Sequence, residues 1–155
     1  MKTKQTISLL AALVLSASAV VAKPIVGPKG GRILTEDAPH VEFLMDANRY
    51  VVISFYDADL KAVPVGEQVA VVMAEAPSGK VKLELVMQDG SLISTARLPA
   101  GEGYRIVVQI RADPSAKPVN HRFEFHSEVC GGCDRAEYAC VCDDHGEQEH
   151  SGHVH

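Results

Sequence analysis

All four cysteines of the chain lie in one short segment, VCGGCDRAEYACVCDDH at residues 129–145. They follow the pattern C-x2-C-x6-C-x-C and are Cys130, Cys133, Cys140 and Cys142. A C-x-x-C turn presents two thiolates to one ion, and the residues before the second pair suffice to fold back and complete a tetrahedral S4 set. Such thiolates suit Zn(II) or Cu(I). The spacing is shorter than in zinc ribbons, which place about 15–20 residues between their pairs.

Histidines extend this candidate metal site. The segment DDHGEQEHSGHVH carries, among acidic residues, His145, His150, His153 and His155. Imidazole is the commonest metal ligand and is mostly neutral at pH 7, and His145 follows Cys142 closely enough to replace one thiolate. Residues 146–155 have no apolar spacing that could pack, so we expect a disordered tail that collects ions. The irregular spacing of these histidines is unlike that of a purification tag.

Two other interpretations of the cysteines remain open. In an oxidising compartment the thiols pair into disulfides, and of the three possible pairings the one that joins Cys140 to Cys142 closes a very small, strained ring. The other two pairings would staple a hairpin and stabilise it by about 2–3 kcal/mol. The CGGC motif is also that of thiol–disulfide catalysts, but these place it at a helix N-terminus, whereas here it follows a predicted strand.

The N-terminal residues predict export. Residues 1–22 combine two lysines, a short apolar run and small residues before the candidate cleavage positions, Ala19 and Ala22, which is the pattern of a secretory signal peptide. The apolar run is too short for the about 20 residues of a membrane span, and no second span follows. We therefore expect a secreted, periplasmic protein. The net charge of −5, without a basic stripe, argues against nucleic acid as a partner.

Short alternating segments make up most of the chain. We expect strands over residues 32–35, 41–45, 50–56, 69–73, 81–87, 92–98, 104–111 and 119–126, and a tight turn at Gln88-Asp89-Gly90-Ser91. No segment has a sustained helical period. The alternation predicts an all-β, antiparallel two-sheet sandwich, immunoglobulin-like or cupredoxin-like. The sandwich would occupy residues 23–128, followed by the cysteine-rich loop at 129–145 and the tail.

The strand parities place individual side chains. His40 shares an outward parity with Glu42, and His126 shares one with Arg122 and Glu124. Each histidine could join a surface metal site, but we expect both to be solvated strand residues. Three methionines have inward parities and are expected to fill the core: Met45, Met73 and Met87. Tyr138 is expected to pack the cysteine loop onto the sandwich. No Ser/His/Asp triad or carboxylate pair can be argued from the spacing, so we do not expect an enzyme.

Residues 27–57 carry a resemblance to known proteins. The run GPKGGRIL, followed by APHVEFLMDANRYVVISFYD, is similar to small exported domains that accompany heavy-metal efflux systems. Some periplasmic adaptors of those pumps have a Gly-Pro-x-Gly-Gly segment before a His-x-Glu-Phe strand. The resemblance implies a role in binding or passing metal ions in the periplasm, with an efflux component as partner. The chain lacks the long helical hairpin and lipoyl-like segment of an adaptor, which implies an accessory or standalone protein.

The sequence thus predicts an exported metal-binding protein without turnover. The four-cysteine loop would hold Zn(II) or Cu(I), the histidine tail would collect ions, and the protein would bind, buffer or deliver them. The alternative is a structural or interaction module whose cysteines form two disulfides and whose sandwich surface is the working face. The state of the thiols distinguishes the two, because a metal site needs thiolates.

Overall fold

The structure, a computed structural model, describes residues 25–142. Apart from the one-turn 3-10 helix η1 (Glu137–Ala139), the regular elements of this part are strands. They are β1 (Arg32–Ile33), β2 (His40–Met45), β3 (Tyr50–Tyr56), β4 (Ala62–Val63), β5 (Val69–Ala76), β6 (Gly79–Gln88), β7 (Ser91–Arg97), β8 (Tyr104–Arg111) and β9 (Val119–Phe125). The all-β expectation is confirmed. No helix among the described residues is long and apolar enough to cross a membrane.

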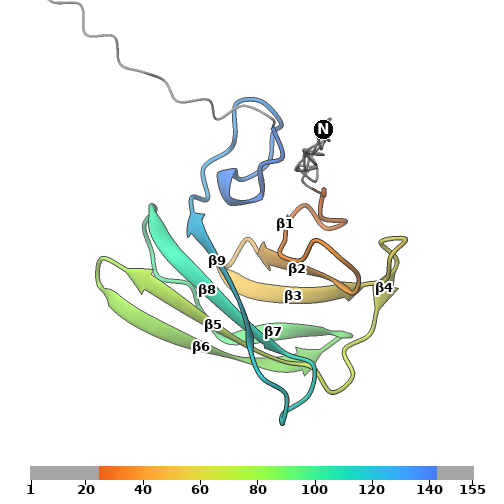
Figure 1. The fold of residues 1–155 in the computed structure, drawn as a ribbon. Helices are drawn as coiled ribbons and strands as arrows, with labels where there is room; N and C mark the ends of the chain where they lie inside the picture. Colours follow the sequence, from red (N-terminus) through yellow and green to blue (C-terminus); the bar gives the residue numbers. More distant parts are fainter. Residues whose placement is uncertain (1–24, 143–155) are drawn as a thin grey trace, which may run out of the picture.

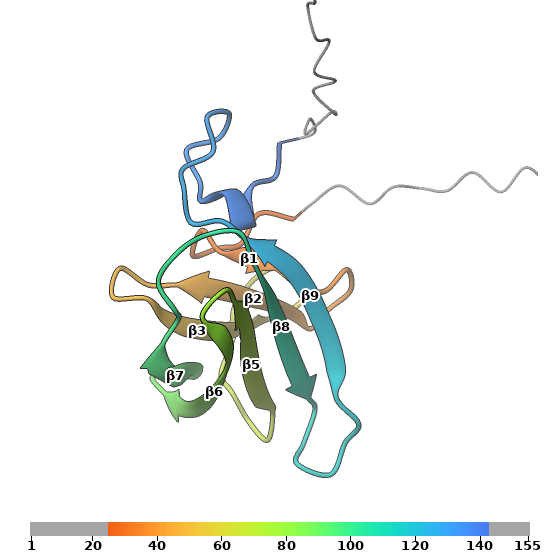
Figure 2. The ribbon, with the colours of Figure 1, turned by 90° about the vertical axis from the view of Figure 1, so that its left-hand side faces the viewer.

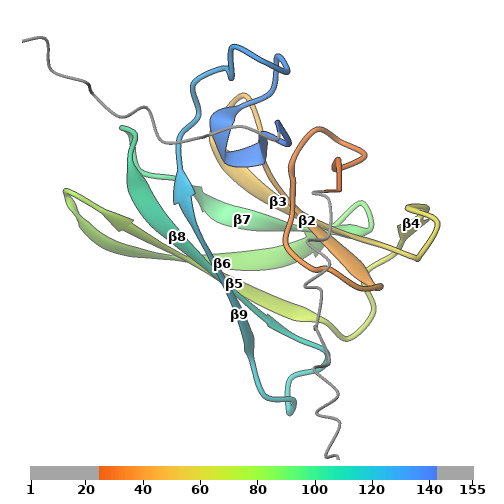
Figure 3. The same ribbon diagram turned by 45° about the horizontal axis from the view of Figure 1, so that its top comes forward.

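The strands form one antiparallel sheet that curls around the core, in the order β1-β2-β3-β7-β6-β5-β8-β9, with β4 beside β3 (Figure 1). The predicted two-sheet sandwich is therefore wrong. Strand β6 joins the two halves because residues 79–84 pair with β5 and residues 85–88 pair with β7. The sheet bends along this strand instead of ending (Figure 3). Alternation within a strand predicts only that one face of the sheet is buried. A single curled sheet buries its inner face just as each of two facing sheets would, so the pattern does not distinguish the two.

A tight turn connects β6 to β7 next to this bend. Asp89 and Gly90 both have positive φ, 50° and 77°, between β6 and β7, which matches a two-residue hairpin turn of type I′. The tight turn predicted there is confirmed. It fixes the register of the strand that joins the two halves, since Gln88 pairs with Ser91 directly across the turn.

The core lies inside the curl and continues to the end where β9 stops. Its largest fully buried apolar side chains come from both halves of the sheet: Phe43, Ile53, Leu83, Ile106 and Phe125. The outer strands approach each other through side chains, because the Arg32 guanidinium of β1 lies 5.1 Å from the ring centroid of Phe123 in β9. Figure 2 shows β1 beside the end of β9. This end of the curl is where the cysteine segment begins.

Four side-chain placements differ from expectation. His40 is 7% exposed and Glu42 is fully buried, and the loop at residues 27–31 covers Glu42 on the side that parity assigns to solvent. Met87, expected in the core, is 61% exposed at the end of β6, where the strand has passed from β5 to β7. Met45 packs partly against the core. Met73, also expected in the core, lies on the outer parity of β5, because both parities of this strand are apolar and the core takes the one with Val72 and Ala74. At Glu42 and Met87 parity fails because a loop or a bend changes which face is covered.

The loop at residues 27–31 closes over Glu42. The carboxylate accepts hydrogen bonds from the backbone N–H groups of Lys29 (3.0 Å) and Gly31 (2.7 Å) and from the Tyr56 hydroxyl (2.5 Å). A Cβ on Gly27 would lie 2.3 Å from the Glu42 Oε1 atom, so only glycine allows this approach. The Gly-Pro-x-Gly-Gly loop and the His-x-Glu-Phe strand are therefore one structural unit, joined by a buried carboxylate.

Replacing this carboxylate should destabilise the domain. We expect Glu42→Gln to lower the free energy of unfolding by about 2–3 kcal/mol, because an amide nitrogen would face donors that now share a charged acceptor. Glu84→Gln, an exposed residue of β6, is the matched control and should change stability by less than about 0.5 kcal/mol. Urea unfolding followed by circular dichroism measures both. Equal stabilities of the two variants would show that the hydrogen bonds to the Glu42 carboxylate do not stabilise the domain.

Candidate metal centre

A short hairpin positions the first two cysteines. Directly after β9, Val129 forms a bridge with Ala136, and the Cys130 N–H donates to the Arg135 carbonyl at 2.6 Å. The turn at its tip needs a left-handed residue, and Asp134 supplies it with a φ of 55°. This turn points Cys133 back toward the base of the hairpin.

The 3-10 helix η1 positions the second pair. The Glu137 N–H donates to the Glu128 carbonyl at 2.8 Å and the Tyr138 N–H to the His126 carbonyl at 2.9 Å, which ties the helix to the end of β9. The Cys140 N–H then donates to the Glu137 carbonyl at 3.1 Å. The position of Cys140 is therefore fixed by the helix and, through it, by the end of β9.

Tyr138 anchors this segment in the core, as predicted. It is 3% exposed, and its ring centroid lies 5.2 Å from that of Phe125 and 5.6 Å from that of Phe43. Its hydroxyl accepts the Met45 N–H at 3.0 Å, and its carbonyl accepts the Arg32 guanidinium at 3.1 Å. The cysteine segment is therefore held on the open end of the curled sheet (Figure 1) by contacts that need no metal.

The four sulfur atoms all lie within 4.8 Å of one another. The Cys130 Sγ is 3.1 Å from that of Cys140 and 3.9 Å from that of Cys142, and the Cys133 Sγ is 3.6 Å from that of Cys140. Four sulfurs around one tetrahedral zinc lie about 3.8 Å apart, given a Zn–S bond of about 2.3 Å. All four cysteines are free, and this cluster could hold a metal ion.

The thiols differ in acidity. The Arg135 backbone N–H donates to the Cys133 sulfur and lowers its pKa to about 7. Hydrogen bonding with the Cys140 and Cys133 sulfurs raises the pKa of Cys142 to about 12. At Cys140, the hydrogen bond from the Cys142 N–H lowers the pKa of the thiol. Hydrogen bonding with the Cys130 sulfur and burial act in the opposite direction, and the pKa of Cys140 is raised overall. Cys133 is thus poised to meet an ion as a thiolate, while Cys140 and Cys142 release protons on binding.

Gly132 lets the backbone approach the sulfurs. A Cβ at this position would lie 2.9 Å from the Cys142 Sγ and 3.9 Å from the Cys130 Sγ, whereas a Cβ on Gly131 would have no heavy atom within 4 Å. The two neighbouring glycines therefore serve different purposes: Gly132 makes room inside the cluster, and Gly131 leaves its outer surface bare.

This difference gives a matched pair of variants. We expect Gly132→Ala to weaken metal binding by about 10- to 100-fold, the range found when a group that orients metal ligands is altered. The added methyl would displace the Cys142 sulfur. Gly131→Ala should bind as the unchanged protein does. Competition with a chromophoric chelator measures both affinities, and equal weakening by the two substitutions would show that glycine flexibility matters rather than room beside the sulfur.

The other predicted ligands, His145, His150, His153 and His155, lie outside the described residues, as do the proposed tail and the signal peptide. Within residues 25–142 the four cysteines are the one group that could hold a metal ion. His126 is exposed as expected, while the buried His40 has an Nδ1 atom without a hydrogen-bond partner in this part of the chain.

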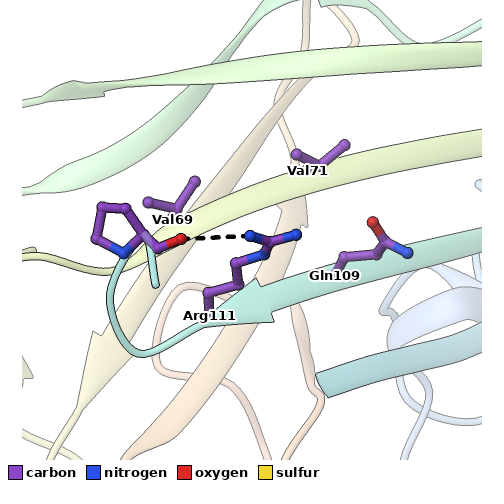
Figure 4. Close-up of a pocket in the computed structure, with 5 residues that line it drawn as sticks. Val69, Val71, Gln109 and Arg111 are labelled. Atoms are coloured by element: carbon purple, nitrogen blue, oxygen red, sulfur yellow. Dashed lines mark hydrogen bonds between the residues drawn. The ribbon is translucent and has the colours of Figure 1, made fainter. Parts of the chain in front are cut away.

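A shallow pocket of about 250 Å³ lies on the outer face of β5 and β8. Figure 4 shows Arg111, which donates to the Pro114 carbonyl at 3.3 Å, beside Val69, Val71 and Gln109. These five lining residues include no acid, no nucleophile and no metal ligand. The pocket therefore offers no chemistry comparable with that of the cysteine cluster.

The chain matches no protein-family model, no curated protein and no solved structure. The fold and the site themselves define the class: an all-β protein with a single curled antiparallel sheet and a C-terminal four-cysteine cluster that could hold a metal ion.

Proposed function

We propose that this protein binds one soft or borderline metal ion, Zn(II) or Cu(I), through Cys130, Cys133, Cys140 and Cys142, and that it buffers or delivers the ion without chemical turnover. The observation that carries the proposal is the convergence of four free thiols to within 4.8 Å. Thiolate sulfur is the ligand type that both ions favour.

The surroundings of the cluster support a bound ion. Four thiolates and a divalent ion carry a net charge of −2, and Arg135, in the same hairpin, brings a positive charge to the loop. Its Nη1 atom is buried and has no hydrogen-bond partner among residues 25–142. Tyr138 holds the loop in place before an ion arrives, so the loop loses little conformational entropy when the ion binds.

The histidines and the N-terminus complete the proposal. His145, His150, His153 and His155 would act as auxiliary or capture ligands beside the thiol site, because neutral imidazole binds both ions. The signal-peptide pattern of residues 1–22 supports export to the periplasm. The resemblance of residues 27–57 to domains of heavy-metal efflux systems supports a component of such a system as the partner that gives or receives the ion.

Intact mass under native and denaturing conditions tests this proposal. We expect protein purified from the periplasm, without tag or chelator, to carry one Zn or Cu in the native spectrum and to show four alkylatable cysteines after denaturation. A mass about 4 Da below that of the reduced chain, without metal or alkylation, would mean two disulfides. That outcome would overturn the thiolate site and favour the structural or interaction module.

A further inference from the structure

The structure divides the four cysteines into firmly held and weakly held ligands. Cys130 is 4% exposed; its N–H donates to Arg135 and its carbonyl accepts the Asp134 N–H. Cys140 follows the buried end of η1 and its N–H donates to Glu137. These two sulfurs are tied to the folded sheet through the hairpin and through Tyr138.

Cys142 is held differently. Its N–H contacts the Cys140 sulfur at 3.4 Å. Neither Cys133 nor Cys142 makes a backbone-to-backbone hydrogen bond within the described residues, but Cys133 lies inside the hairpin that the Val129–Ala136 bridge closes, whereas Cys142 lies outside it. Its side chain is partly exposed. The Cys142 sulfur can therefore leave an ion without breaking the contacts that hold the loop.

The surface beside Cys142 is open to another sulfur. Gly132 lies against the Cys142 sulfur, and Gly131 next to it is exposed, with no heavy atom within 4 Å of the position that a Cβ would take. Val129, on the same hairpin, is 69% exposed. The bare backbone of Gly131, next to the glycine that contacts the Cys142 sulfur, leaves room for the side chain of a docking partner.

Resting on the proposed function, we propose that Cys142 is the exchangeable ligand and that a thiol-bearing acceptor takes the ion by entering over Gly131 and Gly132. The incoming sulfur forms a bond to the ion as the bond from the ion to the Cys142 sulfur breaks. The proton of the incoming thiol passes to the released Cys142 thiolate, so charge and protons balance. Cys130 and Cys140 hold the ion until the acceptor's second thiol engages.

Transfer kinetics test this route. The full-length protein is loaded with Zn(II) and mixed with a synthetic peptide that carries a Cys-x-x-Cys pair. We expect the transfer rate to rise linearly with peptide concentration. Gly131→Leu should slow transfer at least about tenfold and leave the equilibrium affinity within about twofold, since Gly131 does not touch the cluster. Cys142→Ser should still load with Zn(II), at reduced affinity, and transfer it faster, whereas Cys130→Ser should fail to load.

The outcomes separate this inference from the proposed function. If the unchanged protein binds no Zn(II) or Cu(I), the proposed function fails. If it binds Zn(II) but transfers it at a rate independent of peptide concentration, or if Gly131→Leu transfers at the unchanged rate, the exchange route is wrong while the metal site stands. Equal behaviour of Cys142→Ser and Cys130→Ser would also overturn it. Circular dichroism of each variant confirms that the sheet is folded.

Discussion

Tyr138→Ala is expected to lower the free energy of unfolding by about 3–5 kcal/mol, the cost of removing a large aromatic side chain from a core. The ring lies against Phe43 and Phe125 and is 3% exposed. Its loss would open the end of the curled sheet and release the loop that carries the cysteines. We therefore expect metal affinity to fall together with stability, although Tyr138 is no ligand.

The conservative variant separates the ring from its hydroxyl. Tyr138→Phe keeps the aromatic packing and loses only the hydrogen bond from the Met45 N–H, so we expect a cost of about 1–2 kcal/mol and a nearly unchanged metal affinity. Urea unfolding and chelator competition are measured on the same samples. A Tyr138→Ala variant as stable as the unchanged protein would show that the cysteine segment is an appendage and not part of the core.

The second large effect is release of the metal by acid. The pKa values of Cys140 and Cys142 are raised, so both thiols are protonated at neutral pH and each must lose a proton to bind. Displacing the protons of these two thiols weakens the apparent affinity by at least about 100-fold for every unit that the pH falls. Below pH 7 the dependence steepens, because Cys133, with a pKa of about 7, also becomes protonated.

Chelator competition between pH 9 and pH 5.5 measures this slope. From pH 9 to about 7.5 the imidazoles are neutral, so the slope there reports the thiols alone. The matched variant is Cys142→Ser, which removes one displaced proton and should reduce the slope by about one log unit per pH unit. An affinity that changes less than tenfold per pH unit in the unchanged protein would contradict binding through these protonated thiols.

The local elements of this protein are determined by its sequence. Alternating apolar residues predict the longer strands, because burying one face of a strand requires a period of two. Asp89 and Gly90 predict the turn between β6 and β7, because that turn needs positive φ at both positions. The cysteine spacing indicates the cluster, and the lone aromatic Tyr138 within that segment indicates its anchor, since a buried ring is the strongest attachment that the segment can offer.

The tertiary structure alone decided how these elements close. A buried face is compatible with two sheets or one curled sheet. One strand decides between them, because β6 pairs with β5 in its first half and with β7 in its second half. Pairings between strands distant in the sequence, β3 with β7 and β5 with β8, then extend the sheet on both sides of this bend. Glu42 has the parity of a solvated residue, but the loop at residues 27–31 supplies its hydrogen-bond donors and buries it. Likewise, spacing shows that four sulfurs can reach one ion, whereas the hairpin, η1 and the core beneath Tyr138 bring them together, because those contacts arise only when β2, β9 and the C-terminal segment meet.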